Sequence, residues 1–282
     1  MGNYQSARFN PQRTITLLRL RRSDFIDILK FLLVIGAIIW LMVRGSENMG
    51  YNWQWYRIPR YIFSFENGMF TPGPLIDGLA VTFQISGISL FLAFAFGLTT
   101  ALFRLSDSFM AKILARLYLE LIRNTPLLVQ LFFIYFVLSP LLDISRFASA
   151  VLALSLFEGA YASEIFRAGI VSIHRGQWEA AQSLGLNSFN VYVHIVLPQA
   201  VRHILPPLTS QAISLIKDSA LVSTIAIYDL TMQGQMIIAE TYLTFEIWFT
   251  IAAIYLFVNI ILSFGVSMIK RHFKTGELGI GN

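Results

Sequence analysis

The sequence predicts an all-α integral membrane protein, and its composition and its apolar runs are the two observations that predict it. Hydrophobic residues make up 56% of the 282 residues and charged residues only 13%, which is about half the charged fraction of an average soluble domain. A helix of about 20 apolar residues crosses a bilayer, and six runs approach that length. They cover residues 25–44, 79–103, 124–142, 147–168, 205–227 and 246–268.

The first run is separated from the other five by a turn-rich segment between Gly68 and Pro74, where glycine and proline punctuate the chain. Residues 1–74 are therefore expected to contain a cytoplasmic basic tail, a first transmembrane helix and an outer aromatic segment. No small-x-small cleavage site follows the first run, so we interpret it as a retained helix rather than a signal peptide. Residues 75–272 are expected to form a five-helix membrane core, and residues 273–282 a cytoplasmic tail.

Lys and Arg placement predicts the orientation in the membrane. With a cytoplasmic N-terminus, the inside segments hold sixteen of these residues and the outside segments four, namely Arg44, Arg57, Arg60 and Arg146. Cytoplasmic loops carry such an excess of Lys and Arg, so both termini are expected inside the cell. Orientation also explains the net charge of +5 better than nucleic-acid binding does, because the basic residues stand in short groups beside apolar runs.

Several catalytic chemistries are missing from the sequence. The chain has no cysteine, no Gly-Lys-Ser/Thr phosphate loop and no Gly-x-Ser-x-Gly elbow. Its four histidines form no His-Glu-x-x-His pattern, so no metal site is predicted. The chain is not expected to be an enzyme or to bind ATP, and the energy for any transport must come from a gradient or a partner.

A polar segment at about 174–198 stands between two apolar runs and is predicted to face the cytoplasm. Gly185 occupies the position of a left-handed cap for a short helix over 177–184. Ala180 and Ala181 are expected to present a flat face that another protein's groove can approach, and Glu179 to meet a partner's cation. A plain amphipathic connector is the alternative.

A second helical segment is expected to follow this short helix. Asn187 or Ser188 would cap its N-terminus. Pro198 disfavours helix at the residue before it and would end the segment there.

Ionisable residues inside the apolar runs are costly and normally face a partner or a polar cavity. Glu158, Lys217 and Asp218 are candidates for lining a substrate path, and Gln130 and Tyr135 are weaker candidates. A structural network that ties the fourth and fifth runs together is the alternative for each of them. Glu164 and Arg167, three residues apart near the cytoplasmic end, are interpreted as a structural pair.

The polar segment matches a known pattern. Glu179-Ala180-Ala181, then Gly185, then Ile195-Val196-Leu197-Pro198 resembles the EAA loop of the membrane subunits of binding-protein-dependent, type I ABC importers. Three further blocks, at 123–135, 160–170 and 216–221, resemble the polar amino-acid branch of that family.

The resemblance implies a permease subunit in the bacterial inner membrane that forms half of the translocation pathway for a polar amino acid. It implies three partners: a cytoplasmic ABC ATPase dimer, an extracytoplasmic substrate-binding protein, and a second permease subunit, identical or related. ATP and Mg would be bound by the ATPase and no cofactor by this chain. By position in the motif, Glu179, Ala180, Ala181 and Gly185 take the ATPase-coupling role.

A secondary amino-acid transporter or channel without an ATPase partner is the alternative function. It would use the same intramembrane charges but would not need the Glu-Ala-Ala unit. Which amino acid is carried, whether the two permease subunits are identical, what the N-terminal extension does and whether the pore has a selective site stay open on the sequence.

Overall fold

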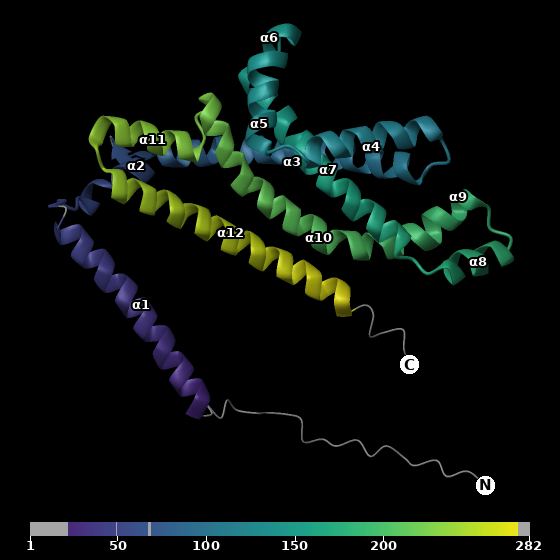
Figure 1. Ribbon diagram of the computed structural model, residues 1–282, viewed down its shortest axis with the longest axis horizontal. Helices are drawn as coiled ribbons and strands as arrows, with labels where there is room; N and C mark the ends of the chain where they lie inside the picture. Colours follow the sequence, from purple (N-terminus) through teal and green to yellow (C-terminus); the bar gives the residue numbers. More distant parts are fainter. Residues whose placement is uncertain (1–21, 49, 67–68, 276–282) are drawn as a thin grey trace. The chain divides into compact units, whose positions relative to one another are not determined.

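A computed structural model describes residues 22–48, 50–66 and 69–275, and helices dominate it (Figure 1). The predicted all-α class is confirmed, with one short β-hairpin added to it. The elements in chain order are α1 (Arg22–Asn48), η1 (Trp55–Arg57), α2 (Pro59–Ile62), β1 (Phe63–Glu66), β2 (Met69–Pro72), α3 (Pro74–Leu105), α4 (Phe109–Arg123), α5 (Leu127–Phe132), η2 (Phe133–Leu138), α6 (Ser139–Leu142), α7 (Arg146–Val171), α8 (Arg175–Ser183), α9 (Ser188–Val191), η3 (Tyr192–Val196), α10 (Leu197–Asp218), η4 (Ser219–Ile225), α11 (Leu230–Thr241) and α12 (Thr244–Thr275).

The chain divides into two units, Met1–Trp53 and Gln54–Asn282. In the first, α1 contains an apolar stretch of 20 residues, Ile26–Gly45, which is long enough to cross a bilayer and agrees with the first predicted run. The domain boundary predicted near residue 74 stays a prediction. The basic tail up to residue 21 and the last seven residues of the predicted C-terminal tail lie outside the described residues.

Four of the described helices, in α1, α3, α7 and α12, are long and apolar enough to span a membrane, and a bent pair can make a fifth span. The predicted run at 205–227 instead lies in α10 and η4. Polar side chains such as Gln199, Arg202 and Gln211 make α10 less apolar than the other spans. A helix of this composition is suited to face protein or a polar cavity rather than lipid.

The predicted run at 124–142 belongs to a longer, broken element. Helix α4 precedes it, and α4 and the helical stretch from Leu127 to Leu142 meet at an angle of 106°. Pro126 explains the break, because the residue before a proline is disfavoured in the α conformation. Gln130 stabilises it: its Nε2 donates to the carbonyl oxygens of Ile122 at 2.7 Å and Thr125 at 3.0 Å.

Close helix packing at small residues positions α3 against α7 in the centre of the second unit. A Cβ added at Gly97 of α3 would lie 2.8 Å from Ala162 Cβ of α7. Tyr118 of α4 packs on the same helix and donates to the carbonyl oxygen of Leu156 at 2.5 Å. In the apolar window of α7, 67% of the residues are buried inside the protein, against 17% for α12. Helix α7 is thus central, whereas α12 keeps most of its apolar surface free for lipid or a partner.

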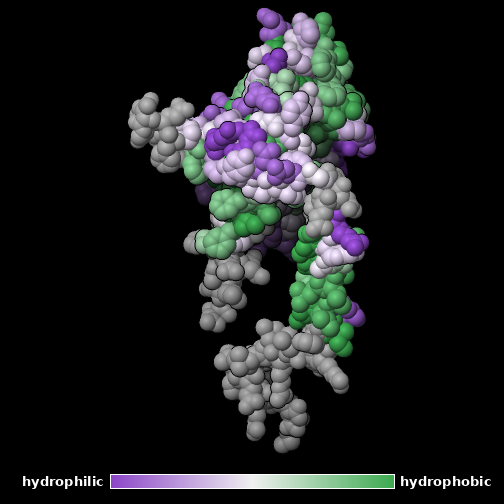
Figure 2. All heavy atoms as spheres, turned by 90° about the vertical axis from the view of Figure 1, so that its left-hand side faces the viewer, coloured by the Kyte–Doolittle hydropathy of each residue, from purple (hydrophilic) through white to green (hydrophobic). Residues whose placement is uncertain are grey.

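Buried polar side chains stabilise the end of the second unit that lies opposite α8, where one of them caps a helix. The Asp229 side chain accepts from the Met232 backbone at 2.9 Å and caps α11. Glu246, fully buried at the start of α12, accepts from the Gln54 backbone at 2.7 Å. Figure 2 views the end where α2 and the start of α12 lie, and shows hydrophilic residues gathered there with hydrophobic residues on the flanks. This is the pattern of a membrane protein's water-facing end.

Candidate coupling helix and translocation pathway

Helix α8 is a separate nine-residue helix that follows the end of α7 (Figure 1). It starts at Arg175, two residues before the predicted start, because His174 caps it: the His174 Nδ1 accepts from the Gly176 backbone at 3.0 Å. Gly176 therefore lies inside the first turn of α8. Glu179 is exposed and pairs with Arg175 at 3.0 Å, one turn earlier.

The end of α8 confirms the predicted left-handed cap. Gly185 has φ +81°. Its backbone N–H donates to the Gln182 carbonyl at 2.9 Å, and the next N–H, of Leu186, donates to the Ala181 carbonyl at 3.3 Å. These two bonds make a Schellman motif, which satisfies the last carbonyls of a helix and requires a residue tolerant of positive φ. Gly185 thus turns the chain sharply toward the next helix.

The two alanines of α8 lie on different faces. Ala180 is exposed, as expected for a residue that faces another protein. Ala181 is only 3% exposed and packs in a core cluster with Val191, Val196 and Ala200. The prediction that both alanines present one flat outer face is therefore wrong for Ala181. Its small side chain instead lets α8 lie close to the helix that follows it.

The second helical segment begins as predicted but does not end at Pro198. Asn187 caps it, with its Oδ1 accepting from the Asn190 backbone at 2.9 Å. Helical structure then continues through α9 and the π-helical turn η3 into α10. Proline is tolerated in the first turn of a helix, where its missing N–H costs nothing, and the π-helical turn before it absorbs the change in hydrogen bonding. The loop is thus mechanically continuous with α10.

Large apolar side chains of this region are exposed outside every candidate span. Leu184 is 82% exposed and Phe189 72%. The rings of Trp178 in α8 and Tyr192 in η3 meet edge to face, with their centroids 4.7 Å apart, and this contact holds α8 on the following helix. These exposed apolar side chains are available for contact with another protein.

A buried carboxylate lies in the middle of the second unit. Glu158 of α7 is 1% exposed, and its Oε2 accepts from the Gln211 side chain of α10. Both line a cavity of about 160 Å³, together with Thr209 and Phe94. The other carboxylate oxygen, Oε1, is buried without a hydrogen-bond partner in the described residues. An unsatisfied acceptor at a cavity is suited to bind a cationic or N–H donor group.

Of the two charged residues at the end of α10, Asp218 lies near Glu158. Their carboxyl groups are close enough to interact, and Lys217 acts on Asp218 electrostatically. The Lys217 side chain is exposed in the structure of this one subunit. The structure thus brings Glu158 and Asp218 together from two helices, whereas Lys217 is exposed. The role of all three residues in a substrate path stays a prediction.

The two weaker candidates lie elsewhere. The Gln130 side chain lies at the break between α4 and α5, where its amide N–H groups donate to backbone carbonyl oxygens. Tyr135 stacks under the Arg146 guanidinium at 5.9 Å. Arg146 begins α7, twelve residues before Glu158, and this is roughly 18 Å along the helix. Neither side chain shares the cavity at Glu158.

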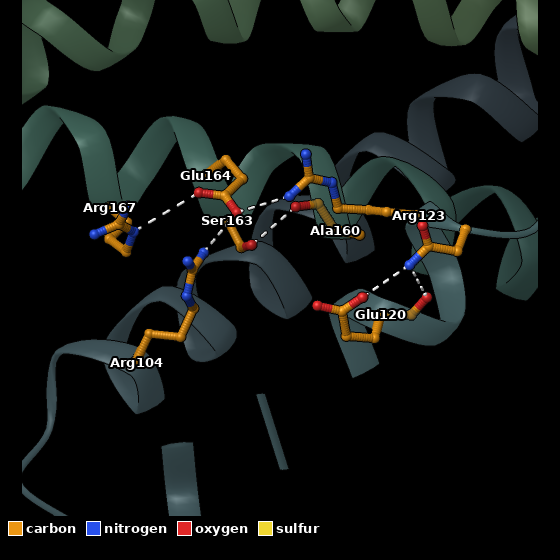
Figure 3. A network of polar contacts seen from close by, with 8 residues as sticks. Arg104, Glu120, Arg123, Ala160, Ser163, Glu164 and Arg167 are labelled. Carbon is orange, nitrogen blue, oxygen red and sulfur yellow. Dashed lines mark hydrogen bonds and ion pairs between the residues drawn. The ribbon is translucent and has the colours of Figure 1, made fainter. Parts of the chain in front are cut away.

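Glu164 is the centre of a larger ion cluster than the predicted pair with Arg167 (Figure 3). Its Oε1 contacts Arg104 of α3 at 2.8 Å and Arg123 of α4 at 2.9 Å. Its Oε2 lies 3.7 Å from Arg167 Nε. One carboxylate therefore joins the ends of three helices.

Sequence reasoning missed Gln211, Arg104 and Arg123 as members of these groups. A signal for Gln211 was present, because it lies seven residues before Asp218 and thus on the same helix face. No comparable signal existed for Arg104 and Arg123, which reach Glu164 from other helices.

Comparison with known proteins identifies the family. Residues 93–275 match the model of the family described as binding-protein-dependent transport system inner membrane component. The glutamine transport system permease protein GlnP of Escherichia coli (strain K12) is 38% identical over 203 residues, which cover 71% of this chain and 93% of that protein. The putative glutamine transport system permease protein GlnP of Rickettsia typhi is 36% identical over 199 residues, which cover 70% and 91%.

Solved structures agree with this assignment. A crystal structure of an amino acid ABC transporter with histidines has a TM-score of 0.67 at 38% identity, covering 71% of this chain and 94% of that one. The MetNI methionine ABC transporter in an inward-facing form shares the fold, with a TM-score of 0.59 at 18% identity. This chain belongs to the inner-membrane components of binding-protein-dependent transport systems and is a permease subunit of an ABC importer.

Proposed function

We propose that the chain forms half of the translocation pathway for a polar amino acid, with α8 as the element through which an ATPase subunit moves the helix bundle. Family membership implies an ATPase and a binding protein as partners and decides against the alternative of a secondary transporter. The observation that supports the proposal most directly is the capped helix α8, outside every span and continuous with α10. Force on α8 would reach α10 and hence the cavity at Glu158.

The coupling surface is proposed to consist of Glu179, Ala180 and the exposed Leu184. Glu179 offers a carboxylate, Ala180 a close approach and Leu184 an apolar contact. Ala181 and Gly185 act differently, since Ala181 seats α8 on its own chain and Gly185 sets its exit angle. An ATPase groove with an apolar floor and a cationic rim is the complementary surface.

The substrate path is proposed to include Glu158, Asp218 and Gln211. Carboxylates suit the ammonium group of an amino acid, and the amide of Gln211 can bind a polar side chain or the carboxylate. Glutamine is the first substrate to test, because the relatives are named for glutamine transport.

The remaining partners and the orientation belong to the same proposal. A type I importer needs two coupling helices for two ATPase subunits, and the described part of this chain has one EAA motif, so we propose pairing with an identical or related permease subunit. ATP and Mg²⁺ are assigned to the ATPase. Both termini are placed in the cytoplasm on the distribution of Lys and Arg.

The test is uptake of labelled amino acids into proteoliposomes that contain the permease, its ATPase and its binding protein. Uptake should require ATP, and Glu158→Gln should lower it about tenfold or more, because a charge-assisted hydrogen bond worth about 1.5–3 kcal/mol is lost. Glutamine at position 158 can still bond Gln211, so the fold should persist. Glu120→Gln, at an exposed carboxylate, is the matched control. Uptake without ATP, or wild-type uptake by Glu158→Gln, contradicts the proposal.

Coupling is tested by co-purification with the ATPase. Ala180→Trp places a bulky ring on the exposed side of α8 and should abolish co-purification. Ala252→Trp, at an exposed alanine of α12, is the matched control and should leave it intact. Equal recovery of the ATPase with both variants contradicts the coupling role of α8.

A further inference from the structure

A basic pocket lies where α3, α4 and α7 meet near the end of the unit that carries α8. Its volume is about 580 Å³. Five cations line it, Arg104, Lys112, Arg116, Arg123 and Arg167. Two carboxylates, Glu120 and Glu164, also line it, so an excess of three positive charges remains.

The cations divide into two groups. Arg104, Arg123 and Arg167 surround Glu164 and are partly neutralised by it (Figure 3). Lys112 and Arg116 line the same pocket, and within the described residues neither makes an ion pair or a side-chain hydrogen bond. They lie four residues apart on one face of α4, where like charges repel. An anion in the pocket would relieve that repulsion.

The pocket lies at the level of a membrane surface. Arg104 is one residue from the end of the span α3, and Arg167 is four residues from the end of the span α7. Four residues of helix extend roughly 6 Å. Arg104 and Arg167 therefore lie near the depth of lipid headgroups, whichever side of the membrane this end faces.

Apolar side chains continue from the pocket along α4. Phe109 and Ile113 line the pocket and are 77% and 42% exposed. The other side of α4 presents an exposed apolar stripe of Met110, Leu114, Leu117 and Leu121. Helix α4 thus joins a cationic face to an apolar face at the headgroup level, which is the chemistry of an interfacial helix.

We propose that this pocket binds the phosphate headgroup of an anionic phospholipid, with the acyl chains against the apolar side chains of α4. Basic pockets between membrane helices bind such headgroups. A free phosphate would use only the cations, whereas a phospholipid also uses Phe109 and Ile113. Lys112 and Arg116 are the residues that contact the phosphate, and the cluster at Glu164 holds the three helix ends in place around it. The site is independent of the transported substrate.

The experiment is native mass spectrometry of the purified full-length permease, titrated with phosphatidylglycerol and with phosphatidylcholine of the same acyl chains. Phosphatidylglycerol should remain bound and phosphatidylcholine should not. Each of Lys112→Gln and Arg116→Gln should weaken phosphatidylglycerol binding about fivefold, and the double variant about 30-fold, at about 1 kcal/mol per cation near the surface. Arg116→Lys keeps the charge and should restore binding.

The matched control is Arg202→Gln, which removes an exposed cation of α10 outside the pocket and should leave binding unchanged. Thermal unfolding midpoints establish that each variant is folded. Equal binding of the two lipids, or equal losses for Arg116→Gln and Arg202→Gln, overturns the proposal. Competition by inorganic phosphate in large excess distinguishes the sources of the anion: complete displacement of the lipid assigns the pocket to a free phosphate and overturns the lipid assignment.

Discussion

Substitution of Gly185 tests whether the geometry at the end of α8 transmits force. The residue has φ +81°, and no heavy atom lies within 4 Å of the position that a Cβ would occupy. The cost of a side chain here is therefore backbone strain alone. A left-handed residue other than glycine costs about 1–2 kcal/mol, and a β-branched residue such as valine stands at the upper end of that range.

A cost of about 2 kcal/mol changes the population of the capped turn about 30-fold. Because the turn joins α8 to the helix that continues into α10, its loss uncouples α8 from the bundle. Gly185→Val should therefore lower ATP-dependent uptake per permease molecule strongly, while the amount of protein in the membrane stays normal. Gly185→Asn should keep much of the activity, since asparagine tolerates the left-handed region, and Gly185→Ala should lie between the two.

The measurements are uptake and stimulation of the partner ATPase in proteoliposomes, normalised to permease content. Gly265→Val is the matched control, because Gly265 of α12 also has free space around its Cβ position but has no positive φ. Normal uptake together with normal ATPase stimulation in Gly185→Val would refute the reasoning. A different order of the three variants would show that backbone strain is not the cause.

Three further predictions concern the rest of the structure. Glu164→Gln should lower the free energy of unfolding by about 1–3 kcal/mol, because the arginines that it joins lose a charge-assisted partner; an unchanged thermal midpoint in detergent would contradict this. Gly97→Val should abolish stable folding, since even a Cβ would lie 2.8 Å from Ala162 Cβ, and a monodisperse chromatography peak at wild-type yield would show the reasoning to be wrong. Burial raises the pKa of Asp229 to about 6, so the folded state holds this proton more tightly than the unfolded state. The free energy of unfolding of the wild type should therefore fall as pH rises from 4 to 7, by up to about 3 kcal/mol. Asp229→Asn keeps the cap but cannot titrate, so its stability should lack this pH dependence. Parallel pH profiles of the two proteins would exclude Asp229 as the source of the pH dependence.

Short-range features of the chain were predictable because their causes are local. The caps at Gly185 and Asn187 follow from the conformations that glycine and asparagine side chains favour, and the structure confirms both. The EAA pattern identified the family for the same reason, since its residues are close together in sequence. The prediction that the helical segment ends before Pro198 was wrong. Proline disfavours helix at the preceding residue in general, but here a π-helical turn before Pro198 accommodates the proline.

Long-range groupings were not predictable in the same way. Glu158 stood out as an intramembrane carboxylate, but its bond to Gln211 depends on how α7 lies against α10. Gln130 and Tyr135 were weaker candidates as polar groups in a span, and the bend between α4 and α5 turns Gln130 to the backbone while the fold places Tyr135 beside Arg146. Hydropathy along a chain indicates which segments lie in the membrane. It does not indicate how each helix is rotated about its axis, and so which of its side chains contact the neighbouring helices.

The sequence by itself determined the class of the protein, four of its six predicted membrane runs and the polar helix that the ATPase is proposed to contact. These depend on composition, on period and on residues within a few positions of one another. Only the tertiary structure decided which face of α8 is free, with Ala180 outward and Ala181 inward, and which charges meet. Arg104, Arg123 and Arg167 gather on Glu164 because α3, α4 and α7 meet there, and the close packing of small residues between α3 and α7, which are far apart in the chain, sets part of that arrangement.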